Sequence, residues 1–256
     1  MATYAHALKY VPGSYAKKRP GAEALSSQYV REWDERRLKW GGRSKYEEAI
    51  PPTLCFSRKI GVGALEIADL LAERTAYRVL DRELLEHIAK EAKLTEKTVA
   101  LFDETYPGKL KEFIALAFGE KSFIHCDYAR HLFSVVLAVA GLAPTIFVGR
   151  GTHLILPRSR VLAIRFVASR AHRVQRLMKI LGATKEVVES RLDQLDREQR
   201  KFFKKAFGQE DAPAYEFDMV INLEYISKPE ESVELVALAF KQKFGMEMEH
   251  VQPSLQ

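Results

Sequence analysis

The sequence has few cysteines, and their arrangement excludes the protein classes that depend on them. Cys55 and Cys126 are too few for a disulfide framework, and no histidine or cysteine completes a metal-ligand spacing with either of them. We therefore expect two reduced and partly buried thiols.

Long hydrophobic runs are also missing. The amino-terminal segment MATYAHALKYVPGSYAKKRPG has no continuous apolar core of the kind that a signal peptide carries. The longest apolar stretch, residues 135–146, is interrupted by Gly141 and Pro144 and is shorter than the roughly 20 residues that cross a bilayer. We therefore predict a cytoplasmic protein with no membrane partner.

The common catalytic templates are absent. The sequence contains no G-x-S-x-G, H-E-x-x-H or C-x-x-C segment, and its seven histidines are scattered. His125 beside Cys126, and His153 after a Gly-Arg-Gly segment, are therefore expected to be structural.

Apolar and charged residues are abundant. Of the 256 residues, 47% are apolar and 29% are charged, which predicts one α/β domain with a large core and an appendage. The net charge of +6 is uneven, because residues 150–205 hold 15 Lys and Arg against 5 Asp and Glu, a surplus of +10 that leaves −4 for the remainder. Such a basic region can bind a polyphosphate, follow nucleic acid or form a solvated helix face, and charge alone does not choose among these.

Residues 1–50 differ from the rest of the chain. Glycine and proline turns interrupt them, and only SSQYVREWDERRLKW, residues 26–40, has the character of a helix. We predict an N-terminal extension that is partly helical or mobile, docks through Tyr29, Trp33 and Trp40, and offers a surface to a protein partner.

From residue 51 to residue 245, short apolar strands alternate with amphipathic helices, a pattern typical of βαβ units and a mostly parallel sheet. One domain is expected over this range, followed by a tail over residues 246–256. The expected strands cover residues 53–57, 77–80, 144–149, 161–168 and 218–222.

The segment SRKIGVGALE after the first strand raises the question of phosphate binding. A phosphate loop joins a strand to a helix through a glycine-rich turn whose N–H groups surround the anion. Gly61 and Gly63 suit such a turn because glycine readily adopts positive φ. Against G-x-x-x-x-G-K-[ST], however, Ala64 stands at the lysine position and Glu66 lies near the hydroxyl position. On its own the segment is more typical of an ordinary tight turn.

Six motifs in a fixed order favour the phosphate loop. They are SRKIGVG (57–63), VLDRELL (79–85), FVGRGTHLILP (147–157), FVASRAHRVQRLM (166–178), LDREQR (195–200) and FDMVIN (217–222). Together they resemble the cytidylate kinase-like family of P-loop nucleoside monophosphate kinases, from Thr53 to about Phe240. The resemblance implies a three-layer α/β P-loop kinase fold. Its parallel five-stranded sheet has the order 2-3-1-4-5, with a helical lid over about residues 184–212 and the N-terminal extension outside.

The resemblance implies that residues of the first loop surround the β-phosphate of ATP, which brings Mg²⁺ with it. The implied residues are Ser57, Arg58, Lys59, Gly61, Val62, Gly63, Ala64 and Leu65. The family commonly reads SRxxGSGG here, so the usual lysine is already missing, and Val62 and Ala64 replace a serine and a glycine. Arg58 and Lys59 are the candidates for the missing cation, and inward and solvated positions for them stay open.

The resemblance places the acceptor nucleotide at Asp81, Arg82 and Arg150. Asp81 would bind sugar hydroxyls or base amino groups, or it would cap the following helix. Arg150 follows a buried strand, and its planar fork suits a phosphate, although a structural salt bridge is the alternative. Gly151 replaces an acid that often helps to organise Mg²⁺ in the family, so we predict no metal ligand from the protein.

The lid is the third implied site. Its candidate residues are Arg191, Asp196, Arg197, Arg200 and Lys201. Phosphoryl transfer depends on alignment and charge neutralisation, so the resemblance gives Arg197 and Arg200, with Arg150, a catalytic role on lid closure. The alternative is a solvated helix with i,i+4 pairs.

Neighbouring residues receive structural roles. We expect Arg173 and Arg176 to be surface ion-pair partners. Phe202, Phe203 and Phe207 should seat a helix on the core, and stacking on nucleic acid is disfavoured.

The implied activity is transfer of the γ-phosphoryl group of ATP to a nucleoside monophosphate, above all CMP or dCMP. The alternative is a nucleotide-binding module, catalytically weak or inactive, that acts as a sensor or scaffold, and Ala64 and Gly151 favour it. A third interpretation is nucleic-acid binding by the basic region, which is disfavoured.

Overall fold

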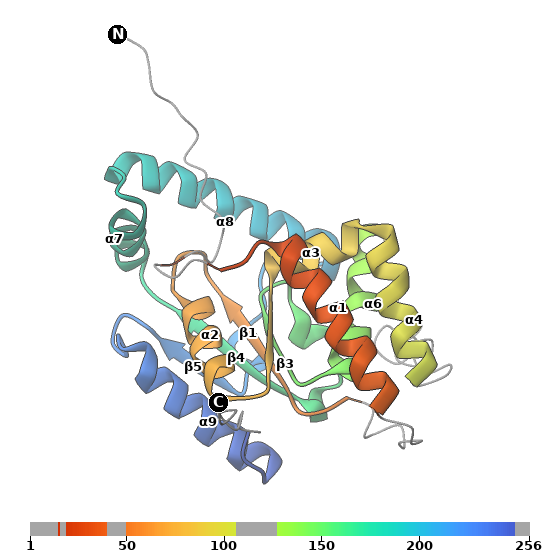
Figure 1. Ribbon diagram of the computed structural model, residues 1–256. Coiled ribbons are helices and arrows are strands. Elements are labelled where there is room, and N and C mark those ends of the chain that lie inside the picture. Colours follow the sequence, from red (N-terminus) through yellow and green to blue (C-terminus); the bar gives the residue numbers. More distant parts are fainter. Residues whose placement is uncertain (1–14, 16–18, 40–49, 106–126, 249–256) are drawn as a thin grey trace.

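The structure is a computed structural model that describes residues 15, 19–39, 50–105 and 127–248 (Figure 1). The predictions for Trp40, His125 and Cys126 lie outside these residues, as does most of the expected tail. Within the described ranges, no helix combines the length and apolarity needed to cross a bilayer.

Five strands form one parallel sheet. They are β1 (Thr53–Arg58), β2 (Arg78–Asp81), β3 (Thr145–Val148), β4 (Val161–Val167) and β5 (Met219–Asn222). Their order is β2-β3-β1-β4-β5, which confirms the order implied by the resemblance, and the five predicted strands are confirmed to within about two residues at their ends. The chain passes from β1 to β2 on one side of the sheet, and after β3 it crosses to β4 on the other side of β1. The carboxyl ends of the central strands therefore border a crevice at this change of direction.

Helices cover both faces of the sheet. They are α1 (Ala22–Lys39), α2 (Ala64–Arg74), α3 (Arg82–Lys90), α4 (Ala92–Thr105), α6 (Asp127–Leu142), α7 (Arg170–Leu181), α8 (Lys185–Phe207) and α9 (Pro229–Phe244).

Alternate side chains of the central strand explain the two helical layers. Cys55 belongs to a core with α1, α3, α4 and α6, whereas Leu54 and Phe56 belong to a core with α2 and α9. Because successive side chains on a strand point to opposite faces, one buried strand serves both layers. The three-layer fold is therefore confirmed.

The helix of the N-terminal extension is packed into the protein. Tyr29, Val30 and Trp33 are buried on α1, which contacts α3 and α4. The helix begins before the predicted residue 26, and its first turn is closed by a hydrogen bond from Leu25 N to Gly21 O at 3.0 Å. Residues 22–39 are thus part of one helical layer.

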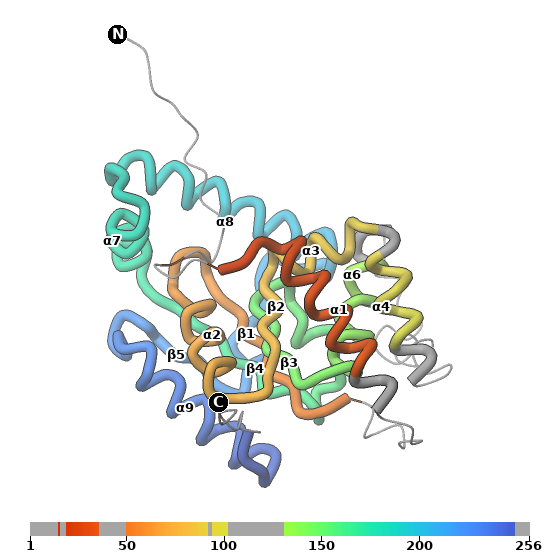
Figure 2. The backbone as a smooth tube through the Cα atoms, viewed as in Figure 1, coloured from red at the N-terminus to blue at the C-terminus, as the bar shows by residue number. Residues whose placement is uncertain are grey.

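Helices α7 and α8 form a hairpin with a small core of its own. Leu177, Val188, Leu192 and Leu195 pack there with Ile60 from the loop after β1. Figure 2 shows α8 running along one end of the sheet, from α7 toward α3. This is the region where the resemblance implies a lid.

Candidate functional site

The loop between β1 and α2, residues 59–63, has the backbone of an anion-binding turn. Gly61 and Gly63 have φ of 85° and 103°, a region that side chains other than glycine rarely occupy. Gly63 is the N-cap of α2 and supplies no side-chain cap; Glu66 N donates to Gly63 O at 3.0 Å, and the N–H groups of Ala64 and Leu65 donate to no capping side chain among the described residues. We call residues 59–63 the glycine loop.

The residues that depart from the family's loop are part of the core. Val62 is 2% exposed and Ala64 is 1% exposed, and both pack with Leu65 in the core of the α2 layer. They add apolar packing where the family has a hydroxyl and a glycine. The loop therefore offers backbone N–H groups and no side-chain hydroxyl from these positions.

Helix α7 covers the glycine loop with two arginines. Arg173 donates from Nη1 to Ile60 O at 3.1 Å and to both oxygens of Asp196, and it is buried. Arg176 pairs with Glu66 at 2.9 Å, and a Cβ built on Gly63 would lie 3.1 Å from its Cζ. The prediction of a surface position is therefore wrong for Arg173, and Arg176 lies against the loop.

The two candidates for the missing cation point to different places. Lys59 forms an ion pair with Asp211 at 2.6 Å, and Asp211 also accepts from Arg165 at 2.6 Å. Burial opposes ionisation of Asp211, but the hydrogen bonds from Arg165 and Lys59 outweigh it and hold its pKa below the ordinary value. Arg58 is instead buried and turns inward, with Nη2 3.8 Å from a Cβ built on Gly149.

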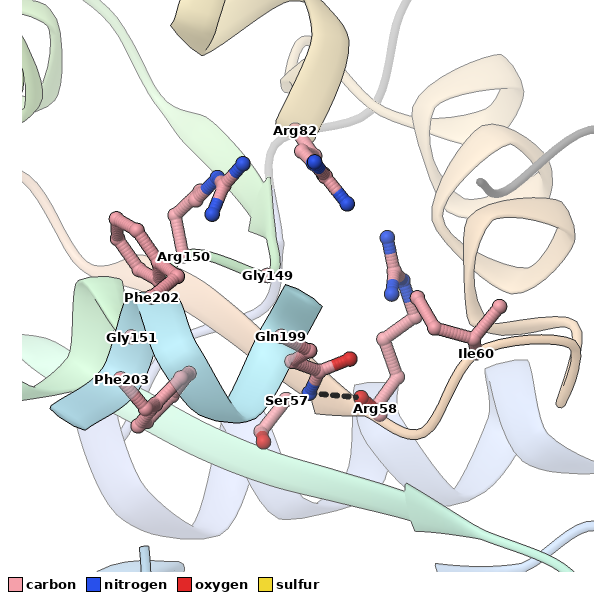
Figure 3. A pocket seen from close by; sticks show the side chains of 10 residues that line it. All are labelled: Ser57, Arg58, Ile60, Arg82, Gly149, Arg150, Gly151, Gln199, Phe202 and Phe203. Atoms are coloured by element: carbon pink, nitrogen blue, oxygen red, sulfur yellow. Dashed lines mark hydrogen bonds between the residues drawn. The ribbon is translucent and has the colours of Figure 1, made fainter. Parts of the chain in front are cut away.

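Three arginines meet in a pocket at the carboxyl end of the sheet. Arg58 ends β1, Arg82 follows β2 and Arg150 follows β3. Figure 3 shows Arg58 and Arg82 pointing toward each other across the pocket, with Arg150 beside Phe202 on a third side. We call this the arginine pocket; its other lining residues are Ser57, Ile60, Gly149, Gly151, Gln199, Phe202 and Phe203.

Arg150 is the most constrained of the three. It has a positive φ of 60°, which is unusual for a residue with a side chain. Its guanidinium contacts Glu86 and lies 4.0 Å from the centre of the Phe202 ring, while its Nε has no hydrogen-bond partner among the described residues.

The charge of Arg150 is poorly balanced. Burial, together with the charges of Arg82 and Arg58 and against the charge of Glu198, lowers the pKa of Arg150 to about 8. Glu86 contacts two of the three guanidinium groups, and an anion that entered the pocket would add further negative charge to this positively charged cluster.

The other two acceptor candidates have partners within the chain. Arg82 donates from Nε to Glu86 at 2.7 Å. Asp81 caps α3, since its Oδ1 accepts from Leu84 N at 2.9 Å, and its Oδ2 accepts from Nη1 of Arg19 at 2.8 Å. The capping alternative thus holds in the structure, and both carboxylate oxygens are engaged.

Helix α8 closes one side of the arginine pocket. Gln199 donates from Nε2 to Arg58 O at 3.1 Å, and Phe202 stacks on Arg150. Phe203 is buried, which confirms the prediction that these aromatic residues seat the helix on the core.

The same helix explains why a glycine follows Arg150. A Cβ built on Gly151 would lie 2.5 Å from the ring of Phe207 and 3.3 Å from Phe203, and its φ of 67° is also left-handed. An acid at this position would therefore require α8 to move.

The predicted lid residues are distributed differently. Asp196 pairs with Arg173, and Arg191 donates to Gln194 at 2.9 Å. Arg197, Arg200 and Lys201 are exposed, and none of them lines the arginine pocket. Their catalytic role stays a prediction that requires α8 to rearrange.

Comparison with known proteins decides the family. The cytidylate kinase-like family matches residues 53–225, which is most of the chain and contains all five strands. The protein belongs to the cytidylate kinase-like family. Helices α1 and α9 lie outside the residues that the family matches.

One solved structure shares the overall fold of this chain. An uncharacterized protein from Eubacterium ventriosum superposes with a TM-score of 0.55 at 16% identity, covering 74% of this chain and 98% of that one. A shikimate kinase from Bacteroides thetaiotaomicron matches with a TM-score of 0.39 at 12% identity, covering 76% and 98%. No curated protein matches the sequence.

The carboxylates of this cytidylate kinase-like site are poorly placed to bind a metal. Asp81, Glu86, Asp196 and Asp211 each accept from an arginine or a lysine. In the ranges that the structure describes, no three His, Cys, Asp or Glu residues form a metal-binding group. In the described ranges, the residues present therefore do not fit a metal held by the protein. That the chain supplies no metal ligand stays a prediction.

A second pocket adjoins the glycine loop on the side of α7 and β5. Gly63, His172 and Arg176 line it together with Leu223 and Ile226 from the segment after β5. We call it the side pocket. Its position next to the N-terminus of α2 makes it continuous with the loop.

Sequence reasoning missed several residues of this site. Gln199 was not predicted, and Phe202 was predicted only to seat the helix on the core, because the neighbouring Arg197 and Arg200 carry the charge expected at a phosphate site. Gln199 and Phe202 lie three residues apart on the inner face of α8, and this helical spacing was the signal that could have revealed them.

Proposed function

We propose that this protein transfers the γ-phosphoryl group of ATP to a nucleoside monophosphate, with CMP or dCMP as the preferred acceptor. The observation that carries the proposal is the convergence of Arg58, Arg82 and Arg150 beside the glycine loop. Three guanidinium groups in one poorly hydrated pocket repel each other, and a phosphate with two negative charges removes that repulsion. Arginine is also the residue whose planar fork best matches phosphate oxygens.

The donor would bind at the glycine loop. The open N–H groups at the start of α2 and the positive φ of Gly61 and Gly63 support a phosphate there. The side pocket would hold the nucleoside part of the donor, with Arg176 at its junction with the loop. Arg176 would then supply the cation that a lysine supplies in other phosphate loops, after exchanging Glu66 for phosphate oxygens.

The acceptor would bind at Arg82 and Arg150. Glu86 contacts both side chains and holds them side by side, which supports a phosphate bound between them. Arg58 lies between this acceptor position and the glycine loop, where a transferring phosphoryl group would pass. Its charge would stabilise the equatorial oxygens in the transition state.

The proposal requires α8 to open. Phe202 and Gln199 close the arginine pocket, so substrates would enter when α8 moves and would be enclosed when it returns. Mg²⁺ would arrive on the phosphates of ATP, in keeping with its usual coordination by phosphates and water.

The test is an activity screen with purified protein, ATP, Mg²⁺ and each nucleoside monophosphate. We expect ADP formation that depends on the acceptor and is fastest with CMP or dCMP. Arg158→Ala serves as the control for Arg150→Ala, because Arg158 is an exposed arginine that pairs with Asp218 away from the pocket. Absence of acceptor-dependent ADP with every nucleotide would count against the proposal.

A nucleotide-binding module without turnover is the second candidate. The burial of Val62 and Ala64 and the contact between Gly151 and Phe207 favour it, because both make the site less adaptable than the family's usual motifs. Calorimetry distinguishes the two. Tight binding of ATP or CMP without turnover would establish the module, whereas acceptor-dependent turnover would remove it.

A further inference from the structure

The chain before α1 reaches the carboxyl end of the sheet and connects two helices of the site. Figure 2 shows this segment beginning on the side of α2 and leading into α1. Arg19 forms ion pairs with Asp69 of α2, from Nε at 3.0 Å, and with Asp81 at the start of α3, from Nη1 at 2.8 Å. The side chains of Arg19, Asp69 and Asp81 are only 17%, 11% and 10% exposed.

The two carboxylates belong to opposite halves of the proposed reaction. Asp69 lies on α2, whose N-terminus follows the glycine loop on the donor side. Asp81 caps α3, and the next residue, Arg82, faces the acceptor position. A single guanidinium therefore links the helix that would hold the donor to the helix that would hold the acceptor.

Each carboxylate has one further contact that fixes its direction. Asp69 accepts from the hydroxyl of Tyr15 at 2.6 Å, and burial together with this hydrogen bond raises the pKa of Tyr15, so the hydroxyl keeps its proton. Asp81 accepts from Leu84 N through its other oxygen. Without Arg19, the two buried carboxylates would lose the guanidinium that bridges them, and their mutual repulsion would loosen the placement of α2 relative to α3.

We propose that Arg19 is a positioning residue that fixes the separation of α2 and α3, and through it the alignment of donor and acceptor. This inference rests on the proposed function. Arg19 lies outside residues 53–225, so the N-terminal extension contributes to a site whose other residues lie within the family match. In-line phosphoryl transfer is sensitive to small displacements, whereas the binding of each nucleotide alone is not.

The test compares Arg19→Met with Arg74→Met. Arg74 is also on α2 and pairs with Glu234, but that pair is exposed and far from α3 in the fold. We expect Arg19→Met to lower kcat by about tenfold or more while the affinity and stoichiometry for CMP and for a non-hydrolysable ATP analogue, measured singly by calorimetry, stay at wild-type values. Arg74→Met should match the wild type in every respect. Unchanged stoichiometry shows that the loss of kcat is not a loss of folded protein.

Two further measurements test the role of Arg19 in positioning α2 and α3 more directly. Hydrogen exchange of the amides of residues 82–86 should be faster in Arg19→Met and unchanged in Arg74→Met, with or without turnover. Arg19→Lys, which keeps the charge but lacks the planar fork, should give an intermediate kcat. Faster exchange in Arg19→Met, found while the wild-type protein shows no kinase activity, would reject the proposed function and retain the link between the helices. Unchanged exchange together with an unchanged kcat would overturn the inference.

Discussion

The glycine loop and the arginine pocket lie at the same end of the sheet, yet they are built in different ways. The loop has lost polar side chains, since Val62 and Ala64 are buried in the core and Lys59 is held by Asp211. The pocket keeps its three arginines and orients them with Glu86, Gln199 and Phe202. Under the proposed function, the donor side would therefore depend on backbone conformation and the acceptor side on side-chain charge.

This difference predicts which kind of substitution should impair each side. A change of backbone should damage donor binding, and a change of charge should damage acceptor binding and transfer. Substitutions at single positions can separate the two, and the expected effects are given from the largest to the smallest.

Replacement of Arg150 should have the largest effect. Arg150→Ala should lower kcat/KM for the acceptor by about a thousandfold, because the acceptor phosphate would lose both a guanidinium partner and the alignment that in-line attack requires. The KM for ATP should stay close to its wild-type value. A steady-state assay with each substrate varied in turn checks both statements, and Arg158→Ala should behave as the wild type. A large rise in the KM for ATP would show that Arg150 serves the donor side instead.

Replacement of Gly63 should damage the donor side alone. Gly63→Ala places a side chain at φ of 103° and 3.1 Å from Arg176. We expect about 1 to 3 kcal/mol of strain, relieved by a shift of the loop that weakens ATP binding by about tenfold or more.

Gly182→Ala is the matched control for Gly63→Ala. Gly182 also has positive φ, 60°, but a Cβ there meets nothing within 4 Å. This variant should lose some stability without any change in the affinity for ATP measured by calorimetry. Equal affinity losses in the two variants would contradict a specific role for the glycine loop.

Replacing Gly151 by the acid that is common in the family should test how closely α8 packs against the turn after β3. Gly151→Asp should destabilise the protein by about 2 to 3 kcal/mol, because its Cβ lies 2.5 Å from the ring of Phe207. In the double variant with Phe207→Ala, the loss should be smaller than the sum of the two single losses. Denaturant unfolding of all four proteins gives the coupling, and strict additivity would contradict a direct clash.

The smallest expected effect is a pH dependence of stability on the acceptor side. His153 is buried against Phe217, and burial lowers its pKa to about 4, with Arg158 and Arg165 adding to the shift. The folded state thus resists a proton that the unfolded state accepts below about pH 6.5. Stability should be unaffected by this group above pH 6.5 and should fall by about 2 kcal/mol as the pH drops from 6.5 toward 4.

The variant His153→Gln should lose most of this pH dependence of stability, whereas His172→Gln, on the donor side, should retain it. Denaturant unfolding at a series of pH values makes the comparison. The account of His153 would be wrong if both variants lost stability in acid as the wild type does.

The sequence pattern was sufficient to predict the strands, and the family resemblance supplied their order. Strands such as residues 53–58 and 161–167 are largely apolar segments bounded by charged or turn residues, and this local pattern favours their burial. Gly61 and Gly63 were also predictable, because the need for positive φ is a property of the residue itself.

The directions of the site residues were not predictable, because they depend on distant partners. Lys59 turns away from the site because Asp211, which is 152 residues later, accepts a hydrogen bond from its ammonium group. Asp81 is engaged by Arg19, and Gly151 is enclosed by Phe207. Local pattern identifies which residues have the right chemistry, and tertiary contacts decide which of them face the ligand.

The most direct test of the central claim is phosphorus NMR of the purified protein with ATP, Mg²⁺ and CMP. We predict that the resonances of ADP and CDP grow together in equal amounts, and that Arg150→Ala abolishes both while Arg158→Ala leaves them unchanged. The account would be contradicted if no nucleoside monophosphate gave a diphosphate product, or if the products formed equally fast without Arg150.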